Sequence, residues 1–472
     1  MIDRAFSLTT DLYELTMAAA YFDNGLHHRG IFELFVRSLP KGRAYLIAAG
    51  LEQVLLHLRD LRFTGEQIDY LRDHTAFKHV SAEFFNYLAE FHFTGDVWAV
   101  PEGTAIFANE PLLRVDAPII EAQIIETYLL ATINFQTSIA SKAARINTAG
   151  QGRSIIEFGT RRAHGTEAGL YAARAAFIGG CGGTSNVEAG YLFGIPTFGT
   201  LAHSFVMAFD SEDDAFRAFL RIFPDTATIL ADTYDTIAAV TRLARDFGPG
   251  IAAVRLDSGD LLQLSKEVRQ ILDDAGMAET RIFASGDLDE YRIEELLARG
   301  ARIDAFGVGT HLSTSYDAPA LGGVYKLVAQ TEDGKTTMRM KLSPEKATFP
   351  GPTQIWRLIN ERGDYVEDLV ALAGEAAPAG GIGSFKPLLE LAMKSGLPTD
   401  EHLLSETGDR PRNRRDRFFR LEAARFRADD ELKRLPRELL KLNSEPNYPV
   451  RISEQLAGER EKLRTRIEAL NR

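Results

Sequence analysis

Between about residue 150 and residue 330 the chain repeats one hydrophobic pattern. Short apolar runs end in loops rich in glycine and polar residues, and helical stretches such as TEAGLYAARAAFIG and DLLQLSKEVRQILDDAG lie between some of them. The runs and their loops read SIIEFGTRR, GGTSN, IPTFGTLAH, AAVRLDSGD, IFASGD and DAFGVGT. Strands that alternate with helices indicate βαβ units and a parallel sheet.

Polar residues recur at nearly every strand end of this segment. That distribution is typical of a TIM-type barrel, whose site is built from loops at the carboxyl ends of many strands. A doubly wound open sheet is the alternative, but it would concentrate its site at one switch point. The pattern therefore favours an α/β fold with an irregular TIM-like (β/α) barrel.

The flanking segments have a different pattern. Residues 30–40 and 95–118 are short extended runs broken by Gly and Pro, and strand-like pieces return after residue 330. The end of the chain mixes charges at helical spacing. We therefore predict a barrel inserted in a β-rich α+β domain that both ends of the chain build. The predicted segments are an N-terminal β-rich α+β domain (1–149), the barrel (150–330), a return segment to the β-rich domain (331–400) and a helical charged tail (401–472).

Composition narrows the classes of function. Lys and Arg number 54 against 66 Asp and Glu, a net charge of −12, so we expect no nucleic-acid partner, because phosphate contacts need a basic surface. The basic run at 410–417 is better explained by a solvated helix face or a subunit contact. Cys181 is the only cysteine, which excludes an intramolecular disulfide and points to the cytoplasm. We expect no secretory signal and no membrane span, since no apolar run approaches about 18 residues.

Two glycine-bearing loops follow neighbouring apolar runs. FGVGT (306–310) and ASGD (284–287) let backbone N–H groups approach an anion closely, and Thr310 adds a hydroxyl donor. Each loop alone is equally consistent with an ordinary tight turn. As a pair after consecutive strands, they favour a phosphate site.

Charged residues gather after another predicted strand, in VRLDSGD (254–260). Strand alternation places Arg255 and Asp257 on the same side. A cation beside a carboxylate suits an anionic ring, a sugar hydroxyl or a Mg²⁺–phosphate group. The structural alternative is an ion pair that only braces the sheet.

EFGTRRAHG (157–165) combines an aromatic ring with cations. Arg161 and Arg162 offer planar guanidinium groups that grip carboxylate or phosphate with two parallel hydrogen bonds. Phe158 beside them is suited to stack on an aromatic substrate. An ordinary core role for Phe158 is the structural alternative.

His203 stands in apolar company within GIPTFGTLAHSFVMAF (194–209), where a strand gives way to a helix. A packed core histidine with one hydrogen bond is the structural explanation. His164 and His311 also lie in strand-end loops, and no carboxylate stands at metal-ligand spacing around either. We therefore expect neither of these two to bind a metal.

A series of stretches resembles the nicotinate phosphoribosyltransferase family over nearly the whole chain: TDLYELTMAAAYF, FELFVRSLPKGRAYLIAAGLEQVL, EFGTRRAHG, GGTSNVEA, FGTLAHSFVMAF, VRLDSGDL, GVGT and LGGVYKLV. The resemblance implies that nicotinate and phosphoribosyl pyrophosphate give nicotinate mononucleotide and pyrophosphate, the first step of NAD salvage from nicotinate. It also implies coupling to ATP hydrolysis, which would make the protein an ATP-coupled ligase. Mg²⁺ would be carried by the substrate pyrophosphate, with no certain protein ligand, and the assembly would be a homodimer.

The resemblance assigns the central role to His203. ATP would phosphorylate its imidazole, whose neutral nitrogen is a nucleophile near pH 7. The phosphoenzyme would bind substrates more tightly and drive the equilibrium toward product. Thr200 matches a substrate-contacting position. We expect His203→Ala to keep the fold and some transferase activity but to lose stimulation by ATP.

The resemblance also implies how substrates are held. Tyr13 would stack on the pyridine ring from the neighbouring subunit, and Phe158 would take the other face. Arg255 matches a nicotinate contact, Arg161 a further anion contact, and Asp257 a catalytic neighbour of the ribose or ring nitrogen. The loops that hold the ribose and the 5-phosphate are represented by Gly286, Asp287, Gly309 and Thr310. Positioning and electrostatics would carry the transfer as the C1 centre gains oxocarbenium character.

Ser185 bears on the choice of base. Nicotinamide-using relatives have an aspartate at the corresponding place, and a carboxylate there would repel nicotinate, whereas a serine hydroxyl donates to it. The alternatives are a nicotinamide- or quinolinate-using phosphoribosyltransferase and a non-catalytic relative that senses a mononucleotide. The chain length and TLAHSF count against the quinolinate enzyme, and the intact set of site residues counts against the sensor.

Overall fold

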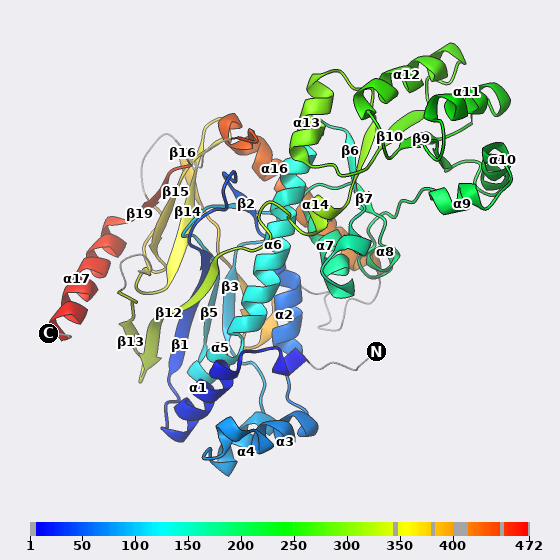
Figure 1. Ribbon diagram of the computed structural model, residues 1–472. Coiled ribbons are helices and arrows are strands. Elements are labelled where there is room, and N and C mark those ends of the chain that lie inside the picture. Colours follow the sequence, from blue (N-terminus) through cyan, green and yellow to red (C-terminus); the bar gives the residue numbers. More distant parts are fainter. Residues whose placement is uncertain are drawn as a thin grey trace. The chain divides into compact units, whose positions relative to one another are not determined.

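The computed structural model describes residues 6–248, 250–342, 348–378, 383–399, 414–443 and 448–470, and Figure 1 labels its elements. The chain divides into two compact units. The first contains residues 1–138, 320–416 and 426–472, and the second contains 139–319 and 417–425. Residues 401–413 of the predicted tail, and with them part of the basic run at 410–417, lie outside the described residues.

A seven-stranded sheet, in the order β13-β12-β1-β5-β3-β17-β18, organises the first unit. The strand β1 (Arg29–Val36) pairs antiparallel with β12 (Gly323–Glu332) on one side and with β5 (Pro111–Pro118) on the other. Its sequence RGIFELFV is buried along nearly its whole length, as an interior strand requires. The other strands of this sheet are β3 (Asp96–Ala99), β13 (Lys335–Met338), β17 (Glu390–Lys394) and β18 (Leu397–Pro398). Segments far apart in the chain therefore share one sheet.

Two smaller sheets complete the strands of this unit. One is β16-β14-β15-β19, formed by Gly383–Pro387, Thr353–Asn360, Tyr365–Leu372 and Val450–Ile452, and the other pairs β2 (Leu46–Ile47) with β4 (Ala105–Ile106). Its helices are α1 (Leu12–Asp23), α2 (Leu51–Asp60), α3 (Gly65–Asp73), α4 (Ala82–Ala89), α5 (Ile119–Ile124) and α17 (Glu454–Leu470), with short turns at Phe6–Leu8, Thr75–Phe77 and Arg437–Leu440. Two helices, α6 (Glu126–Ala149) and α16 (Arg414–Arg434), have residues in both units.

A buried ion cluster ties α16 to the strands of the first unit. Arg357 is only 1% exposed and donates to both carboxylate oxygens of Asp368 and to Glu431 of α16, at 2.6–2.9 Å for the shortest contacts. The Nη2 group that bonds Asp368 also donates to the carbonyl of Ala105 at 2.8 Å. Each nitrogen of this guanidinium thus has an acceptor, as a buried charge requires.

The second unit is built on a six-stranded parallel sheet in the order β7-β6-β11-β10-β9-β8. Figure 1 labels β6, β7, β9 and β10 of this sheet. The strands are β6 (Ser154–Glu157), β7 (Gly183–Thr184), β8 (Thr228–Leu230), β9 (Ala253–Leu256), β10 (Arg281–Ala284) and β11 (Ala305–Val308). The connecting helices are α7 (Thr166–Ile178), α8 (Val187–Phe193), α9 (His203–Met207), α10 (Glu212–Ile222), α11 (Thr236–Asp246), α12 (Leu261–Asp274), α13 (Glu290–Ala298) and α14 (Thr310–Ser313), with a short turn at Thr160–Arg162. The predicted mixed α/β fold with a parallel sheet is confirmed.

The sheet is a curled half-barrel with β7 and β8 at its edges in the described part of the chain. Closure into a TIM-like barrel, insertion of that barrel in the other domain, and the boundaries after residues 149, 330 and 400 stay predictions. None of the helices in the described segments combines the length and the hydropathy that a membrane crossing requires.

Candidate functional site

The predicted site residues of the second unit gather where the parallel strands end. Phe158 follows β6, Ser185 follows β7, Arg255 lies in β9, Gly286 follows β10 and Gly309 follows β11. Parallel strands direct all their carboxyl ends to one edge of a sheet, so local strand–loop order alone collects these residues. Thr200, from the segment between α8 and α9, and His203, the first residue of α9, reach the same edge through the contacts described next.

Arg255 is the centre of the cluster. Its side chain is 11% exposed, and Nη1 donates to Thr200 Oγ1 at 2.7 Å while Nη2 donates to Asp257 Oδ1 at 2.7 Å. Nε donates to Ser285 Oγ at 2.8 Å, and that hydroxyl donates in turn to Asp257 Oδ1 at 2.6 Å. The predicted placement of Arg255 and Asp257 on one side of the strand is confirmed, and the two do form an ion pair.

Asp257 is held in its charged form by its neighbours. Burial alone would raise its pKa, but the hydrogen bond from Ser285 and the charge of Arg255 outweigh burial and keep the pKa below its ordinary value. Asp257 Oδ2 lies 4.0 Å from Nε2 of His203. A carboxylate that stays ionised therefore faces the imidazole.

His203 begins the short helix α9 with a side chain that is 43% exposed. Its Nδ1 lies 3.2 Å from Thr233 Oγ1, which is the only hydrogen-bond partner of this ring among the described residues. This exposure does not fit a packed core histidine. The imidazole is held at one nitrogen and open at the other.

Asp232 belongs to the same cluster, although the sequence reasoning did not name it. It follows β8, and its Oδ2 accepts from the Asp257 N–H at 2.9 Å and from the Ser258 hydroxyl at 2.7 Å. Its Oδ1 is buried and has no hydrogen-bond partner within the described segments. The available signal was the run TILADTYD, which ends an apolar strand in polar residues as the named loops do.

Phe158 lies beside Arg255, whose guanidinium carbon is 5.8 Å from the ring centroid. The ring also packs at 5.4 Å from the ring of Phe283. A Cβ on Gly307 would come within 2.8 Å of Phe158 and 2.9 Å of Phe283, so only glycine fits between the two rings. Phe158 thus packs on the sheet and also borders the Arg255 cluster, and its stacking on a substrate ring stays a prediction.

The two glycine loops reach the same cluster. A Cβ on Gly286, whose φ is +94°, would lie 2.1 Å from the carbonyl oxygen of Asp257, so this close approach requires glycine. Asp287 follows with a positive φ of +43°. Gly309 lies just before α14 and Thr310, and a Cβ there would be 3.4 Å from the carbonyl oxygen of Phe158.

Three predicted residues are not joined to the cluster by side-chain contacts. Arg161 and its neighbour Arg162 are both exposed, so the structure does not separate their roles. Among the described contacts, Ser185 is tied only through its backbone N–H, which donates to the carbonyl of Glu157 at 2.9 Å. Tyr13 belongs to α1 of the first unit and is 46% exposed; its partial burial and the nearby Glu126 raise its pKa.

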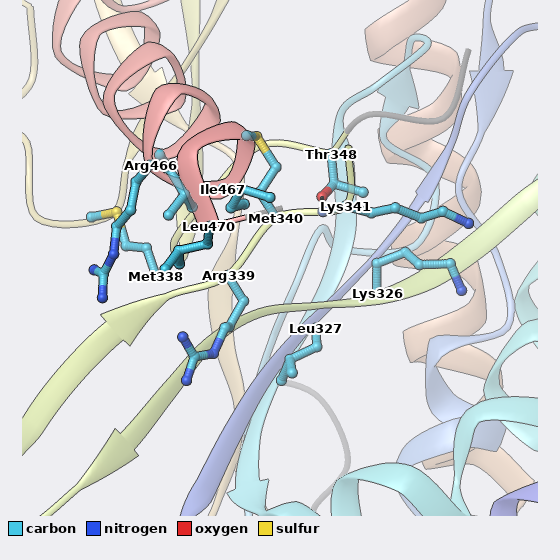
Figure 2. A pocket seen from close by; sticks show the side chains of 11 residues that line it. Lys326, Leu327, Met338, Arg339, Met340, Lys341, Thr348, Arg466, Ile467 and Leu470 are labelled. Atoms are coloured by element: carbon cyan, nitrogen blue, oxygen red, sulfur yellow. Dashed lines mark hydrogen bonds between the residues drawn. The ribbon is translucent and has the colours of Figure 1, made fainter. Parts of the chain in front are cut away.

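A separate pocket of about 380 Å³ lies in the first unit, between α17 and the strands β12 and β13. Figure 2 shows Lys326 and Lys341 extending to one side and Arg339 and Arg466 to the other. The described part of the lining carries these four cations and no acidic residue, so it favours anions. The rest of the lining is Leu327, Met338, Met340, Thr348, Leu463, Ile467 and Leu470. Among the described residues no group of His, Cys, Asp and Glu is arranged to hold a metal ion.

Comparison with known proteins gives a consistent family. The nicotinate phosphoribosyltransferase N-terminal domain matches residues 8–134, the nicotinate phosphoribosyltransferase family matches 153–338, and the corresponding C-terminal domain matches 353–458. The chain is 45% identical over 464 residues to the nicotinate phosphoribosyltransferase pncB2 of Mycobacterium tuberculosis, covering 97% of this chain and 94% of the relative. It is 46% identical over 383 residues to the Bacillus subtilis nicotinate phosphoribosyltransferase, covering 79% and 77%. The crystal structure of human nicotinic acid phosphoribosyltransferase matches with a TM-score of 0.82 and 30% identity, over 96% of this chain and 99% of the human one.

Proposed function

The chain belongs to the nicotinate phosphoribosyltransferase family, and on that premise we propose that it converts nicotinate and phosphoribosyl pyrophosphate into nicotinate mononucleotide and pyrophosphate, with ATP hydrolysis coupled through phosphorylation of His203. The observation that carries the proposal is the position of His203 beside the Arg255–Asp257 pair. Its Nε2 lies 4.0 Å from Asp257, and Asp257 in turn bonds Arg255 at 2.7 Å. A nucleophilic imidazole and an anion-binding guanidinium thus share one carboxylate.

The imidazole is suited to accept a phosphoryl group. When Nδ1–H donates to Thr233 Oγ1, the lone pair of the ring is on Nε2. Attack of Nε2 on the γ-phosphorus of ATP forms an N–P bond and breaks the bond to the bridging oxygen, so ADP leaves with that electron pair. Hydrolysis later breaks the N–P bond and releases phosphate. The ligase class follows from this coupling.

The transfer step needs positioning more than covalent help. The pyridine nitrogen attacks C1 of the phosphoribosyl group while the bond from C1 to the pyrophosphate oxygen breaks, and pyrophosphate leaves with the electron pair and its Mg²⁺. Arg255 would hold the nicotinate carboxylate, and the charged Asp257 would stabilise the cationic character at C1. The loops at Gly286–Asp287 and Gly309–Thr310 would cradle the ribose and the 5-phosphate with backbone N–H groups.

The remaining assignments follow the family resemblance. Ser185, with no carboxylate of its own, would favour nicotinate over nicotinamide. Tyr13 is exposed on α1, which supports the proposal that it reaches the site of a second subunit in a homodimer and stacks on the pyridine ring opposite Phe158. Arg161 would add a further contact to substrate anions. The single cysteine, Cys181, is buried and its pKa is raised by burial, which suits a reducing cytoplasm.

One assay tests this function. Nicotinate, nicotinamide and quinolinate are offered in parallel with phosphoribosyl pyrophosphate and Mg²⁺, each with and without ATP, and mononucleotide and ADP are measured. We expect product from nicotinate, raised by ATP. His203→Ala should keep a basal rate and lose the ATP effect, whereas the matched control His164→Ala, an exposed histidine of another strand-end loop, should keep both. An ATP effect that survives His203→Ala would overturn the phosphohistidine, and product from nicotinamide alone would overturn the role of Ser185.

A further inference from the structure

A buried carboxyl group lies directly beneath the predicted base-binding residues. Glu157 is the last residue of β6 and is fully buried. One carboxylate oxygen accepts the backbone N–H of Gly159, and the other accepts the hydroxyl of Thr184 at 2.6 Å. The side chain therefore connects the loop after β6 with the end of the neighbouring strand β7.

Backbone and side-chain bonds extend this connection. The carbonyl of Glu157 accepts the Ser185 N–H at 2.9 Å. Thr184 Oγ1 also accepts the Asn186 N–H at 2.9 Å, and the Asn186 amide donates to Thr160 Oγ1 at 3.1 Å. The loop that carries Phe158 and Arg161 and the loop that carries Ser185 are thus fastened to each other at several points around one carboxyl group.

A third loop is hydrogen-bonded to the backbone of Thr184. The backbone N–H of Thr184 donates to the carbonyl of Pro196 at 3.0 Å, and its carbonyl accepts the N–H of Phe198 at 2.9 Å. The segment 196–202 contains Thr200 and is followed directly by His203. A displacement of Thr184 would therefore shift the backbone of all three loops.

Glu157 occupies this position without a cation. No ion pair of its carboxylate is found among the described residues, and burial raises its pKa while the bonds from Thr184 and Gly159 oppose the rise. Burying a carboxyl group in this way costs free energy that a Leu or Met of similar volume would not cost. Such a departure from an apolar core is expected where geometry at a site matters.

We propose that Glu157 is a positioning residue that fixes the spacing of the Phe158 and Ser185 loops and so sets the affinity for the pyridine base. The assignment deepens the proposed function and rests on it. The Glu157 carboxylate makes no hydrogen bond to the Arg255–Asp257 pair or to the loops at Gly286 and Gly309 among the described contacts. Gly159 does lie against the segment after Gly309, since its carbonyl accepts the Ser313 hydroxyl at 3.3 Å. Loss of Glu157 is therefore expected to change the binding of nicotinate more than the binding of phosphoribosyl pyrophosphate.

The test compares loss variants with conservative ones. Glu157→Met and Thr184→Val remove the acceptors or the hydroxyl at nearly constant volume. Each should raise the KM for nicotinate about ten- to hundred-fold, the loss expected for hydrogen bonds to a charged group, and should change the KM for phosphoribosyl pyrophosphate by a clearly smaller factor. Glu157→Gln and Thr184→Ser keep an acceptor and a hydroxyl, and should restore most of the affinity.

The chain offers a matched control at the amino ends of the strands of the same sheet, whereas Thr184 lies at a carboxyl end. Thr280 is also buried, and its hydroxyl donates to the carbonyl of Ile251 at 3.0 Å just before β10. Thr280→Val should lower the unfolding midpoint as Thr184→Val does, but leave both KM values unchanged. If Glu157→Met does not fold, the Thr184→Val and Thr184→Ser pair decides.

Two results would overturn the assignment while leaving the proposed function intact. One is an active parent enzyme whose loss variants keep the parental KM for nicotinate. The other is a parallel change in both KM values, which would mark Glu157 as a general structural residue. A parent enzyme that forms no mononucleotide from nicotinate would overturn the proposed function, and the assignment with it.

Discussion

Replacing Ser285 by alanine should weaken the Arg255–Asp257 pair without removing either member. The Ser285 hydroxyl accepts from Arg255 Nε at 2.8 Å and donates to Asp257 Oδ1 at 2.6 Å. Ser285 is 3% exposed, so water does not readily replace the lost hydroxyl. The change removes the only bond of Nε that the described residues supply and one acceptor bond of Asp257.

The magnitude follows from the bonds that remain. A hydrogen bond to a charged group contributes about 1.5–3 kcal/mol, and two such bonds are lost. Arg255 keeps its bonds to Thr200 and Asp257, and the Asp257 side chain is 28% exposed, so part of the loss is recovered. We expect kcat/KM for nicotinate to fall by about 2 kcal/mol, or roughly 30-fold.

The pH dependence gives a second, independent readout. The Ser285 bond helps to hold the pKa of Asp257 below its ordinary value, so its removal raises that pKa. The contribution of ionised Asp257 is present above its pKa and is lost as the pH falls through it. The acid limb of the profile of kcat/KM against pH should therefore move to higher pH in Ser285→Ala and return in Ser285→Thr. A Ser285→Ala enzyme within twofold of the parent, with an unmoved acid limb, would refute this reasoning.

Three further changes test other parts of the molecule. Arg357→Leu leaves the buried carboxylates of Asp368 and Glu431 without their cation. It should lower the free energy of unfolding, measured by urea denaturation, by about 3–5 kcal/mol. A loss below about 1 kcal/mol would contradict the role of the buried cluster. Glu14 is buried, and burial raises its pKa to about 7. Its protonated form therefore stabilises the fold at a pH below its unfolded pKa near 4.5. This contribution, about 2–3 kcal/mol, is lost as the pH rises to about 7. Glu14→Gln should flatten that slope in unfolding curves taken between pH 4.5 and 8, and an unchanged slope would assign it to other groups. Ser185→Asp should raise the KM for nicotinate at least about tenfold and lower the KM for nicotinamide, because a like charge at contact costs more than about 1 kcal/mol. If a competition assay shows an unchanged preference for nicotinate over nicotinamide, Ser185 has no role in base selection.

Most strand ends of the second unit were predictable because their signal is local, but the run IPTF (195–198) forms only an isolated bridge at Thr197, and the strand β8 was not predicted. An apolar run followed by a polar, glycine-bearing loop specifies a buried strand and the place where it stops, and strand alternation then puts Arg255 and Asp257 on one side. Parallel order does the rest, since it brings all carboxyl ends to one edge. The closed barrel did not follow from the same evidence, because alternation says nothing about whether the edge strands β7 and β8 meet.

The residues that sequence reasoning missed are those whose roles depend on neighbours from other strands. Ser285 looks like any small residue of a tight turn until β10 is placed beside β9, where its hydroxyl meets Arg255. Asp232 and Glu157 are single acids at strand ends, and only the pairing of β8 with β9 and of β6 with β7 gives them partners. Such positions hold the contact residues in place, and their chemistry is set by tertiary geometry that one sequence does not display.

The charges around His203 indicate how its phosphorylation would act on substrate binding. Asp257 and Asp232 together outnumber the single cation Arg255 in the cluster, and Asp257 engages Arg255 at 2.7 Å. A phosphoryl group on Nε2 would add negative charge about where Nε2 lies, 4.0 Å from Asp257, a separation at which like charges repel by about 4 kcal/mol near a protein surface. That repulsion would loosen the hold of the ionised Asp257 on Arg255. The loosened guanidinium would be free for an anionic base, so the proposed phosphate would act through the Arg255–Asp257 pair and not through a direct contact with nicotinate.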